Sequence, residues 1–98
     1  MTVYVDPLVQ YAFRPTARFS GRWCHLTADT PAELHAFAQQ LGLRRTWFQD
    51  HPTLWHYDLT LSKRAVAVRT GAVEVGRMEM GRMMRKRAQA MALTQGEN

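Results

Sequence analysis

The sequence predicts an α+β fold: a single small domain in which a β-β-α-β-α-β chain forms a sheet with helices packed on one face. Short segments rich in Val, Thr and aromatic residues alternate with longer segments whose apolar residues have helical spacing. The length of 98 residues is that of one domain, and 46% apolar residues is typical of a folded protein. We therefore expect a compact domain over residues 1–75, followed by a basic, Met-rich helical extension over 76–98.

The first half of the chain is predicted to contain two strands and a helix. The strands cover residues 2–5 and 23–26, and a long ordered loop over 7–22 separates them. Thr30 is the expected N-cap of the helix, with Pro at the first helical position and Glu three residues after the cap. Gly42 supplies the C-terminal stop.

The second half is predicted to contain two further strands with a helix between them. Residues 45–49 form the third strand, and a Pro-containing loop follows it. The helix begins at a cap supplied by Thr60 or Ser62 and ends at Gly71. The fourth strand covers residues 72–75.

The last predicted helix covers residues 77–93 and carries a stripe of methionines at Met80, Met84 and Met91. Met packs adaptably, so such a stripe is typical of a core, dimer or partner contact. Since a small domain encloses a ligand better between two copies, we expect a homo-oligomer that uses this stripe.

The net charge of +5 predicts an anionic partner. Eleven of the thirteen basic residues are Arg, which favours bidentate recognition of phosphate or carboxylate. The last 23 residues hold five basic residues against two acidic ones. Nucleic acid is therefore a candidate partner through residues 77–87, and a small nucleotide-like anion is the other.

The cellular setting is predicted from the single cysteine and from hydropathy. Cys24 has no second cysteine to pair with, so a reducing, cytoplasmic environment is expected. No apolar run reaches the roughly 18–20 residues needed to cross a bilayer, so we expect no membrane span. Cys24 has no clear neighbouring base and is not expected to be a nucleophile. No cofactor is expected.

The anionic ligand is expected to bind near the start of the second predicted helix. Free backbone N–H groups there suit a phosphate, and Lys63 and Arg64 add positive charge. Rings and polar groups just before the helix would stack on a base and bond to ribose. The complete predicted binding set is Gln49, Trp55, His56, Tyr57, Asp58, Ser62, Lys63 and Arg64. The alternative is a solvated charge pair beside an ordinary Ser cap.

Histidines are the candidate catalytic residues if the protein is an enzyme. His25, His35 and His56 titrate near neutral pH and suit general acid-base chemistry, although a structural role is the alternative for each. His51, His56 and Asp58 can in principle bind a metal. Their spacing matches no standard zinc pattern, so we expect no metal site.

The ordered motifs together resemble a family of small phage and actinobacterial proteins that share a domain of unknown function. The matching pieces are VYVD (3–6), CHL (24–26), AD (28–29), ELH (33–35), WFQ (47–49), HYDL (56–59), SKRA (62–65) and GAVEV (71–75). The resemblance covers most of residues 3–75 and leaves the basic tail outside. It supplies no established activity. It implies that the family pattern includes His25, Asp29, His35, His56, Asp58 and Arg64.

Three classes of function follow. The leading hypothesis is a protein that binds a nucleotide-derived anionic ligand without cleaving it. Because small basic phage proteins can capture the nucleotide signals of bacterial immunity, its specific form is a phage anti-defence sponge for an ADP-ribose-type or cyclic-nucleotide signal. The first alternative is a small His-dependent phosphodiesterase or nuclease. The second is a nucleic-acid-binding module that uses the basic tail.

Overall fold

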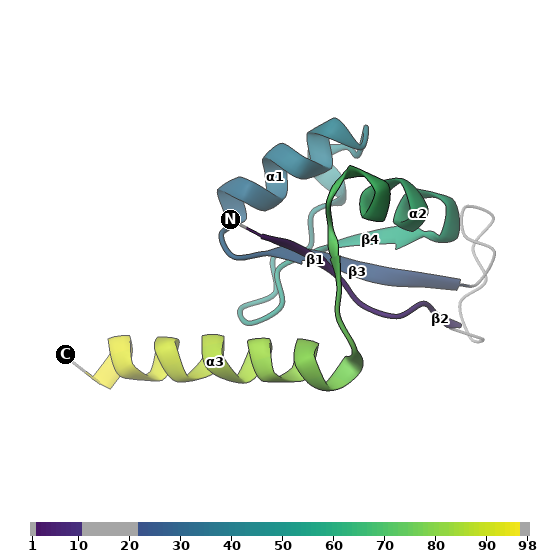
Figure 1. Cartoon of the computed structure of the whole chain (residues 1–98). Coiled ribbons are helices and arrows are strands. Elements are labelled where there is room, and N and C mark those ends of the chain that lie inside the picture. The colour runs from purple at the N-terminus through teal and green to yellow at the C-terminus, as the bar shows by residue number, and fades with distance from the viewer. Residues whose placement is uncertain (1, 11–21, 97–98) are drawn as a thin grey trace.

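The computed structural model describes residues 2–10 and 22–96, and its helices lie on both sides of a mixed sheet (Figure 1). Helices α1 (Pro31–Gln40) and α2 (Leu61–Thr70) cover one face. The C-terminal helix α3 (Arg77–Gly96) runs along the opposite side. The predicted α+β class is therefore confirmed, with two helices on one sheet face and a separate C-terminal helix.

The central strand of the sheet is β3 (Arg22–Ala28), which pairs along both of its edges. On one edge it pairs antiparallel with β1 (Val3–Val5) and β2 (Val9–Gln10). On the other edge it pairs antiparallel with β4 (Tyr57–Thr60). The last strand, β5 (Val73–Glu74), lies parallel to β1. β3 thus brings together segments from the start and the middle of the chain.

The predicted strands of the first half are confirmed, with longer pairing than expected. The strand predicted over residues 23–26 extends through Ala28 as β3. The segment predicted as a loop over 7–22 contains β2, which pairs with the start of β3. Residues 11–21 of that segment lie outside the described residues.

The core lies between the sheet and the helices α1 and α2. Leu26 of β3 and Leu59 of β4 are fully buried, as is Leu34 of α1. Ala67 is the buried residue of α2, and its small side chain lets the helix approach the sheet closely. Burial of a leucine side chain contributes about 1.5–3 kcal/mol, so this layer is the main source of stability.

Both helices begin and end at predicted signals. The side chain of Thr30 accepts a hydrogen bond from the backbone N–H of Glu33, and the two side chains also bond to each other. For α2 the cap is Thr60, whose hydroxyl accepts from the backbone N–H of Lys63. Gly42 and Gly71 follow the helices with φ of 78° and 122°, conformations that side chains disfavour.

The third predicted strand, over residues 45–49, is wrong. Arg45–Trp47 form a 3₁₀ helix, and the strand that pairs with β3 is β4, about ten residues later. In β4, Tyr57 and Leu59 are buried and alternate with the less buried Asp58 and Thr60, as a half-buried strand requires. The rings of Trp47 and Phe48 pack against the core from an irregular segment instead.

The predicted C-terminal helix is confirmed and begins at Arg77. The exposure of its methionine stripe increases along the helix: Met80 is 3% exposed, Met84 is half-buried and Met91 is 40% exposed. The stripe is therefore covered by the domain only near its beginning. Among the helices described, none has the length and apolarity needed to cross a membrane.

Candidate functional site

The pairing of β3 with β4 places two polar side chains beside each other. His25 and Asp58 are opposite partners in the antiparallel register, so both point to the same face of the sheet. His56 precedes Asp58 by two residues and has the same facing. This is the face opposite α1 and α2, because the alternate residues Cys24, Leu26, Tyr57 and Leu59 belong to the buried core.

His25 is held by Asp6, which follows strand β1. One carboxylate oxygen of Asp6 accepts from the backbone N–H of His25 at 2.6 Å, and the other accepts from its ring Nδ1 at 2.7 Å. Both residues are largely buried. The two bonds orient the His25 ring and leave its Nε2 facing away from Asp6.

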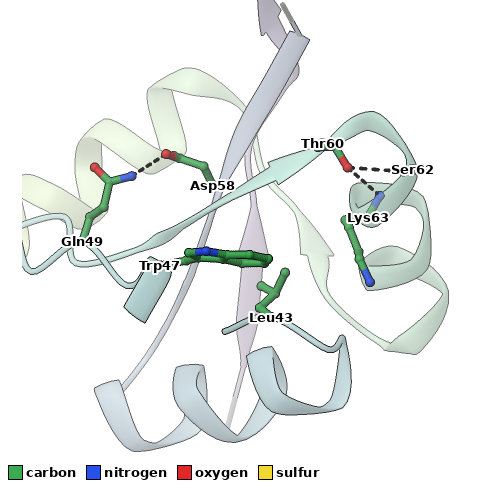
Figure 2. Close-up of a pocket in the computed structure, with 7 residues that line it drawn as sticks. All are labelled: Leu43, Trp47, Gln49, Asp58, Thr60, Ser62 and Lys63. Carbon is green, nitrogen blue, oxygen red and sulfur yellow. Dashed lines mark hydrogen bonds between the residues drawn. The ribbon is translucent and has the colours of Figure 1, made fainter. Parts of the chain in front are cut away.

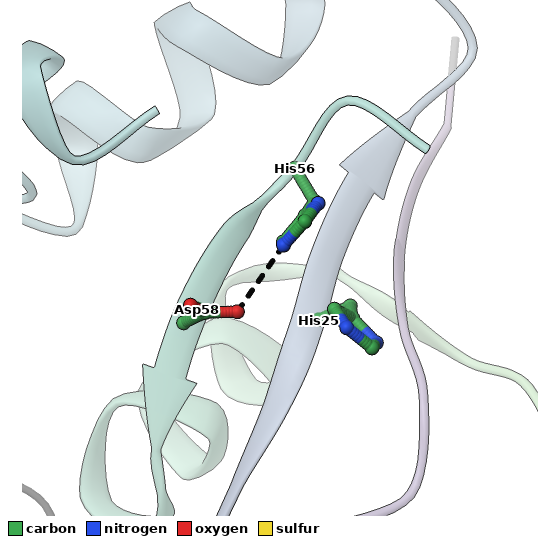
Figure 3. A group of neighbouring side chains, drawn as sticks. All are labelled: His25, His56 and Asp58. Atoms are coloured by element: carbon green, nitrogen blue, oxygen red, sulfur yellow. Dashed lines mark ion pairs between the residues drawn. The ribbon is translucent and has the colours of Figure 1, made fainter. Parts of the chain in front are cut away.

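His56 meets both His25 and Asp58 (Figure 3). The two imidazole rings lie edge to face with centroids 4.7 Å apart. Nδ1 of His56 donates to the carbonyl of Leu54 at 2.7 Å, and Nε2 lies 3.3 Å from Oδ1 of Asp58. The described residues provide no hydrogen-bond partner for this buried Oδ1, while the Gln49 amide donates to Oδ2. His25, His56 and Asp58 form what we call the His-His-Asp cluster.

The electrostatics of the cluster favour a cation. The hydrogen bond that His25 donates to Asp6 raises the pKa of His25, and burial lowers it. The charges of Asp6 and Asp58 raise it further, and the net change is upward. Two carboxylates thus act on two imidazoles in a partly desolvated place. Such a site can hold a proton on His25 or bind a positive ion.

A pocket of about 560 Å³ opens next to the cluster and shares Asp58 with it. We call it the Trp47 pocket, since the indole ring lies at its centre, along β4 (Figure 2). Its lining combines this ring with an amide, a carboxylate, two hydroxyls and an ammonium group. The lining residues are Leu43, Trp47, Gln49, Asp58, Thr60, Ser62 and Lys63.

The comparisons with known proteins give a family. The family model described as "Protein of unknown function (DUF4031)" matches residues 3–87. The chain belongs to the DUF4031 family. No curated protein and no solved structure matches it. The resemblance to a family with a domain of unknown function is thereby confirmed. The match reaches residue 87, so it includes part of α3, which the resemblance had been expected to leave outside.

In this DUF4031 protein the basic residues at the start of α2 point to different places. Lys63 lines the Trp47 pocket and donates to the carbonyl of Leu41 at 2.7 Å. Arg64 turns toward β1 and β5, where it bonds to the carbonyl of Asp6 at 2.9 Å and to the carboxylate of Glu74 at 3.0 Å. The structure therefore places Lys63 in the pocket and gives Arg64 structural partners.

The two rings predicted to stack on a ligand lie away from the Trp47 pocket. Trp55 is half-buried under the guanidinium of Arg87. Tyr57 is 1% exposed, and its hydroxyl lies 2.9 Å from Nδ1 of His35. Burial lowers the pKa of His35, and the charge of Arg45 lowers it further. His35, a residue of α1, contacts Tyr57 on the sheet face that α1 covers, apart from the His-His-Asp cluster.

The remaining sequence candidates have local partners. Nδ1 of His51 accepts from the backbone N–H groups of Thr53 and Leu54, so this histidine orders its own loop. Asp29 accepts from the hydroxyl of Tyr4 at 2.8 Å and from the backbone N–H of Thr2. Cys24 is buried, and desolvation raises its pKa to about 12, which agrees with the expectation that it is not a nucleophile.

Sequence reasoning missed Trp47 and Asp6 as site residues. The sequence predicts that Trp47 lies in the third strand, and only the 3₁₀ turn shows that its ring also faces a pocket. Asp6 had one available signal: a carboxylate directly after a strand that pairs with the strand of His25. That signal depends on a pairing between residues far apart in the chain.

Proposed function

We propose that this DUF4031 protein binds a small anionic ligand with a planar ring, of the nucleotide class, in the Trp47 pocket. The observation that carries the proposal is the composition of the lining, in which one aromatic ring, one ammonium group and several hydrogen-bonding side chains surround about 560 Å³. This volume is within the range of about 300–1,000 Å³ that is usual for small-molecule sites.

Each portion of such a ligand has a matching group among the lining residues in this proposal. The indole of Trp47 offers a flat surface on which a base stacks. The Lys63 ammonium has three donors and uses one on Leu41, so two are left for a phosphate. Ser62 is exposed beside it at the start of α2, where backbone N–H groups also favour an anion. In this proposal Gln49 and Asp58 bond to ribose or to base edges.

The specific ligands that we propose to test first are ADP-ribose-type and cyclic-nucleotide signals of bacterial immunity. The support is the phage setting of the family that the motifs resemble, together with the pocket chemistry. In an anti-defence role the protein would sequester the signal without consuming it. The ligand must then be recovered unchanged after the protein is denatured.

A hydrolase that cleaves the same class of ligand is the second candidate. The observation in its favour is the contact between His25 and His56, whose ring centroids are 4.7 Å apart. Both histidines lie beside the pocket residue Asp58. Histidines in such a position suit phosphodiester chemistry. His35 does not share in this arrangement, so the enzyme hypothesis now depends on His25 and His56.

The binding test is calorimetry with a panel of AMP, ADP, ADP-ribose and cyclic dinucleotides, performed in EDTA. Ser62→Glu places a negative charge at the pocket and at a helix start, where an acid stabilises the helix. We expect this variant to fold normally and to bind at least tenfold more weakly. Ala32→Glu makes the same charge change at the same position of α1, outside the pocket lining, and should bind like the wild type.

Trp47→Leu tests the stacking surface. Loss of base stacking costs about 1–3 kcal/mol, which corresponds to roughly 5- to 150-fold weaker binding. Chromatography of a second mixture, prepared without EDTA and then heat-denatured, separates the two candidates: intact ligand supports sequestration, and new products support hydrolysis. Absence of binding across the whole panel would refute the proposed function.

A further inference from the structure

The His-His-Asp cluster offers three metal-ligating atoms in one place. One ring nitrogen from each of His25 and His56, and one carboxylate oxygen from Asp58, lie within 4.8 Å of one another. Ligands at 2.0–2.1 Å from a tetrahedral zinc are about 3.4 Å apart, so the widest gap would need to close by at most about 1.4 Å. Metal binding therefore requires small rotations of these side chains.

The hydrogen bonds of the two histidines leave a ligating nitrogen on each ring. A backbone carbonyl can only accept, so Nδ1 of His56 carries the proton that it donates to Leu54. Nδ1 of His25 likewise carries the proton that it donates to Asp6. In the neutral form of each ring, Nε2 therefore has a free lone pair, which is the form that binds a metal.

Asp58 supplies an independent observation. Its Oδ1 is buried and has no hydrogen-bond partner among the described residues, although Nε2 of His56 lies 3.3 Å away. Two lone pairs at this distance repel each other unless a positive charge lies between or beside them. A buried acceptor without a partner is costly, and either a proton on Nε2 of His56 or a metal ion bound by both atoms would satisfy it.

The hydrogen-bond partners of the cluster are of the kinds that orient metal ligands in known sites. Asp6 orients His25 through a carboxylate–imidazole hydrogen bond, and the carbonyl of Leu54 orients His56. The Gln49 amide donates to the second oxygen of Asp58 and so directs Oδ1 toward the histidines. Ligating histidines and carboxylates are usually held by partners of these kinds.

We infer that His25, His56 and Asp58 bind one divalent transition-metal ion. Two imidazoles and one carboxylate select the borderline ions of the Zn²⁺ and Fe²⁺ class over Mg²⁺, which prefers oxygen ligands. Three protein ligands leave at least one coordination position open for water or another molecule. The inference shares Asp58 with the Trp47 pocket but does not rest on the ligand proposed there.

The test is a titration of the full-length, tag-free protein, stripped with EDTA and dialysed, in the absence of nucleotide. Calorimetry with Zn²⁺, and visible absorption with Co²⁺, measure affinity, stoichiometry and coordination. We expect one ion per chain, a Co²⁺ spectrum with d–d bands of a site with nitrogen and oxygen ligands, and no binding of Mg²⁺ at equal concentration.

Variants identify the ligands. His56→Ala and Asp58→Asn should each weaken Zn²⁺ binding at least tenfold, while His51→Ala, a histidine outside the cluster, should bind like the wild type. Asp6→Asn leaves all three ligands in place and should weaken binding about 10- to 100-fold, the usual effect of losing an orienting partner. Circular dichroism checks that each variant is folded.

If a ligand variant fails to fold, nitrogen-15 NMR of the wild type shows which histidines bind the metal. Zinc must then shift the ring nitrogens of His25 and His56 and leave those of His35 and His51 unchanged. The inference is overturned if the wild type binds neither Zn²⁺ nor Co²⁺ saturably, or if His56→Ala and Asp58→Asn bind as tightly as His51→Ala. It is also overturned if the spectra show only a stable His56 imidazolium paired with Asp58. Loss of metal binding leaves the nucleotide-binding test unaffected, because its calorimetry is performed in EDTA.

Discussion

Arg87 of α3 lies over the indole ring of Trp55, with its guanidinium carbon 4.0 Å from the ring centroid. The same guanidinium donates to the carbonyls of Ala28 at 2.7 Å and Thr53 at 3.1 Å, and to the hydroxyl of Thr27 at 3.3 Å. A residue of the C-terminal helix thus joins the end of β3 to the loop before β4. Burial lowers the pKa of Arg87, as expected for a cation taken partly out of water.

Loss of this contact should destabilise the whole domain. Arg87→Ala removes a cation–π contact and leaves the carbonyls of Ala28 and Thr53 without their donor. We expect a decrease of about 2–4 kcal/mol in the free energy of unfolding. Guanidinium chloride denaturation measures it. Arg85→Ala, at an exposed position of the same helix, is the control and should change stability by less than about 0.5 kcal/mol.

The exposed basic residues of α3 test the nucleic-acid hypothesis. Arg77, Arg82, Arg85 and Lys86 are exposed, in contrast to Arg87. Replacement of Arg82, Arg85 and Lys86 together by Ala should leave stability nearly unchanged. If α3 binds nucleic acid, the triple variant must bind single- or double-stranded DNA more weakly, with a smaller slope of log affinity against log salt. An unchanged slope in fluorescence anisotropy would exclude Arg82, Arg85 and Lys86 as phosphate contacts.

The pH dependence of stability should contain a contribution from His35. Because its pKa lies below the ordinary value of 6.5, the folded state binds fewer protons than the unfolded state under mildly acidic conditions. The stability that neutral His35 supplies is present above pH 6.5 and is lost as the pH falls through the folded-state pKa. We expect the wild type to lose more stability than His35→Gln between about pH 7.5 and pH 5. Equal losses in urea denaturation would contradict this.

Two glycines should respond oppositely to the same substitution. Gly71 has a φ of 122°, which disfavours any side chain even though no atom lies within 4 Å of an added Cβ. Gly71→Ala should therefore destabilise the protein by about 1–3 kcal/mol. Gly81 lies inside α3 with ordinary helical geometry, and Gly81→Ala should stabilise by about 0.5–1 kcal/mol. Thermal unfolding of both variants gives the comparison.

Local signals were enough for the helices. The Thr30 and Thr60 caps, and the glycines after each helix, act through bonds and φ values within a few residues. Such effects can be predicted from a short stretch of sequence. The third strand was harder, because residues 45–49 and residues 57–60 both contain residues with high strand propensity. The segment that completes the sheet is the one whose alternate residues, Tyr57 and Leu59, fill the core.

The candidate site likewise depends on pairings between distant residues that local signals do not reveal. Sequence reasoning grouped His56 with His51 because they are neighbours in the chain, but His51 bonds within its own loop. The cluster instead joins His56 to His25, through the register that pairs β3 with β4. Likewise, Lys63 and Arg64 are adjacent in sequence, and successive residues of a helix point about 100° apart, so only Lys63 lines the pocket.

The α+β class, the two capped helices, the basic C-terminal helix and the family can all be predicted from the amino-acid sequence. These features depend on local propensity, on the spacing of apolar residues and on ordered motifs. The residues of the candidate site follow from the folded arrangement instead: Trp47 rather than Trp55 lines the pocket, and His25 rather than His51 lies beside His56. Strand register and helix direction bring these distant side chains within a few ångströms, and neither is contained in any one segment of the chain.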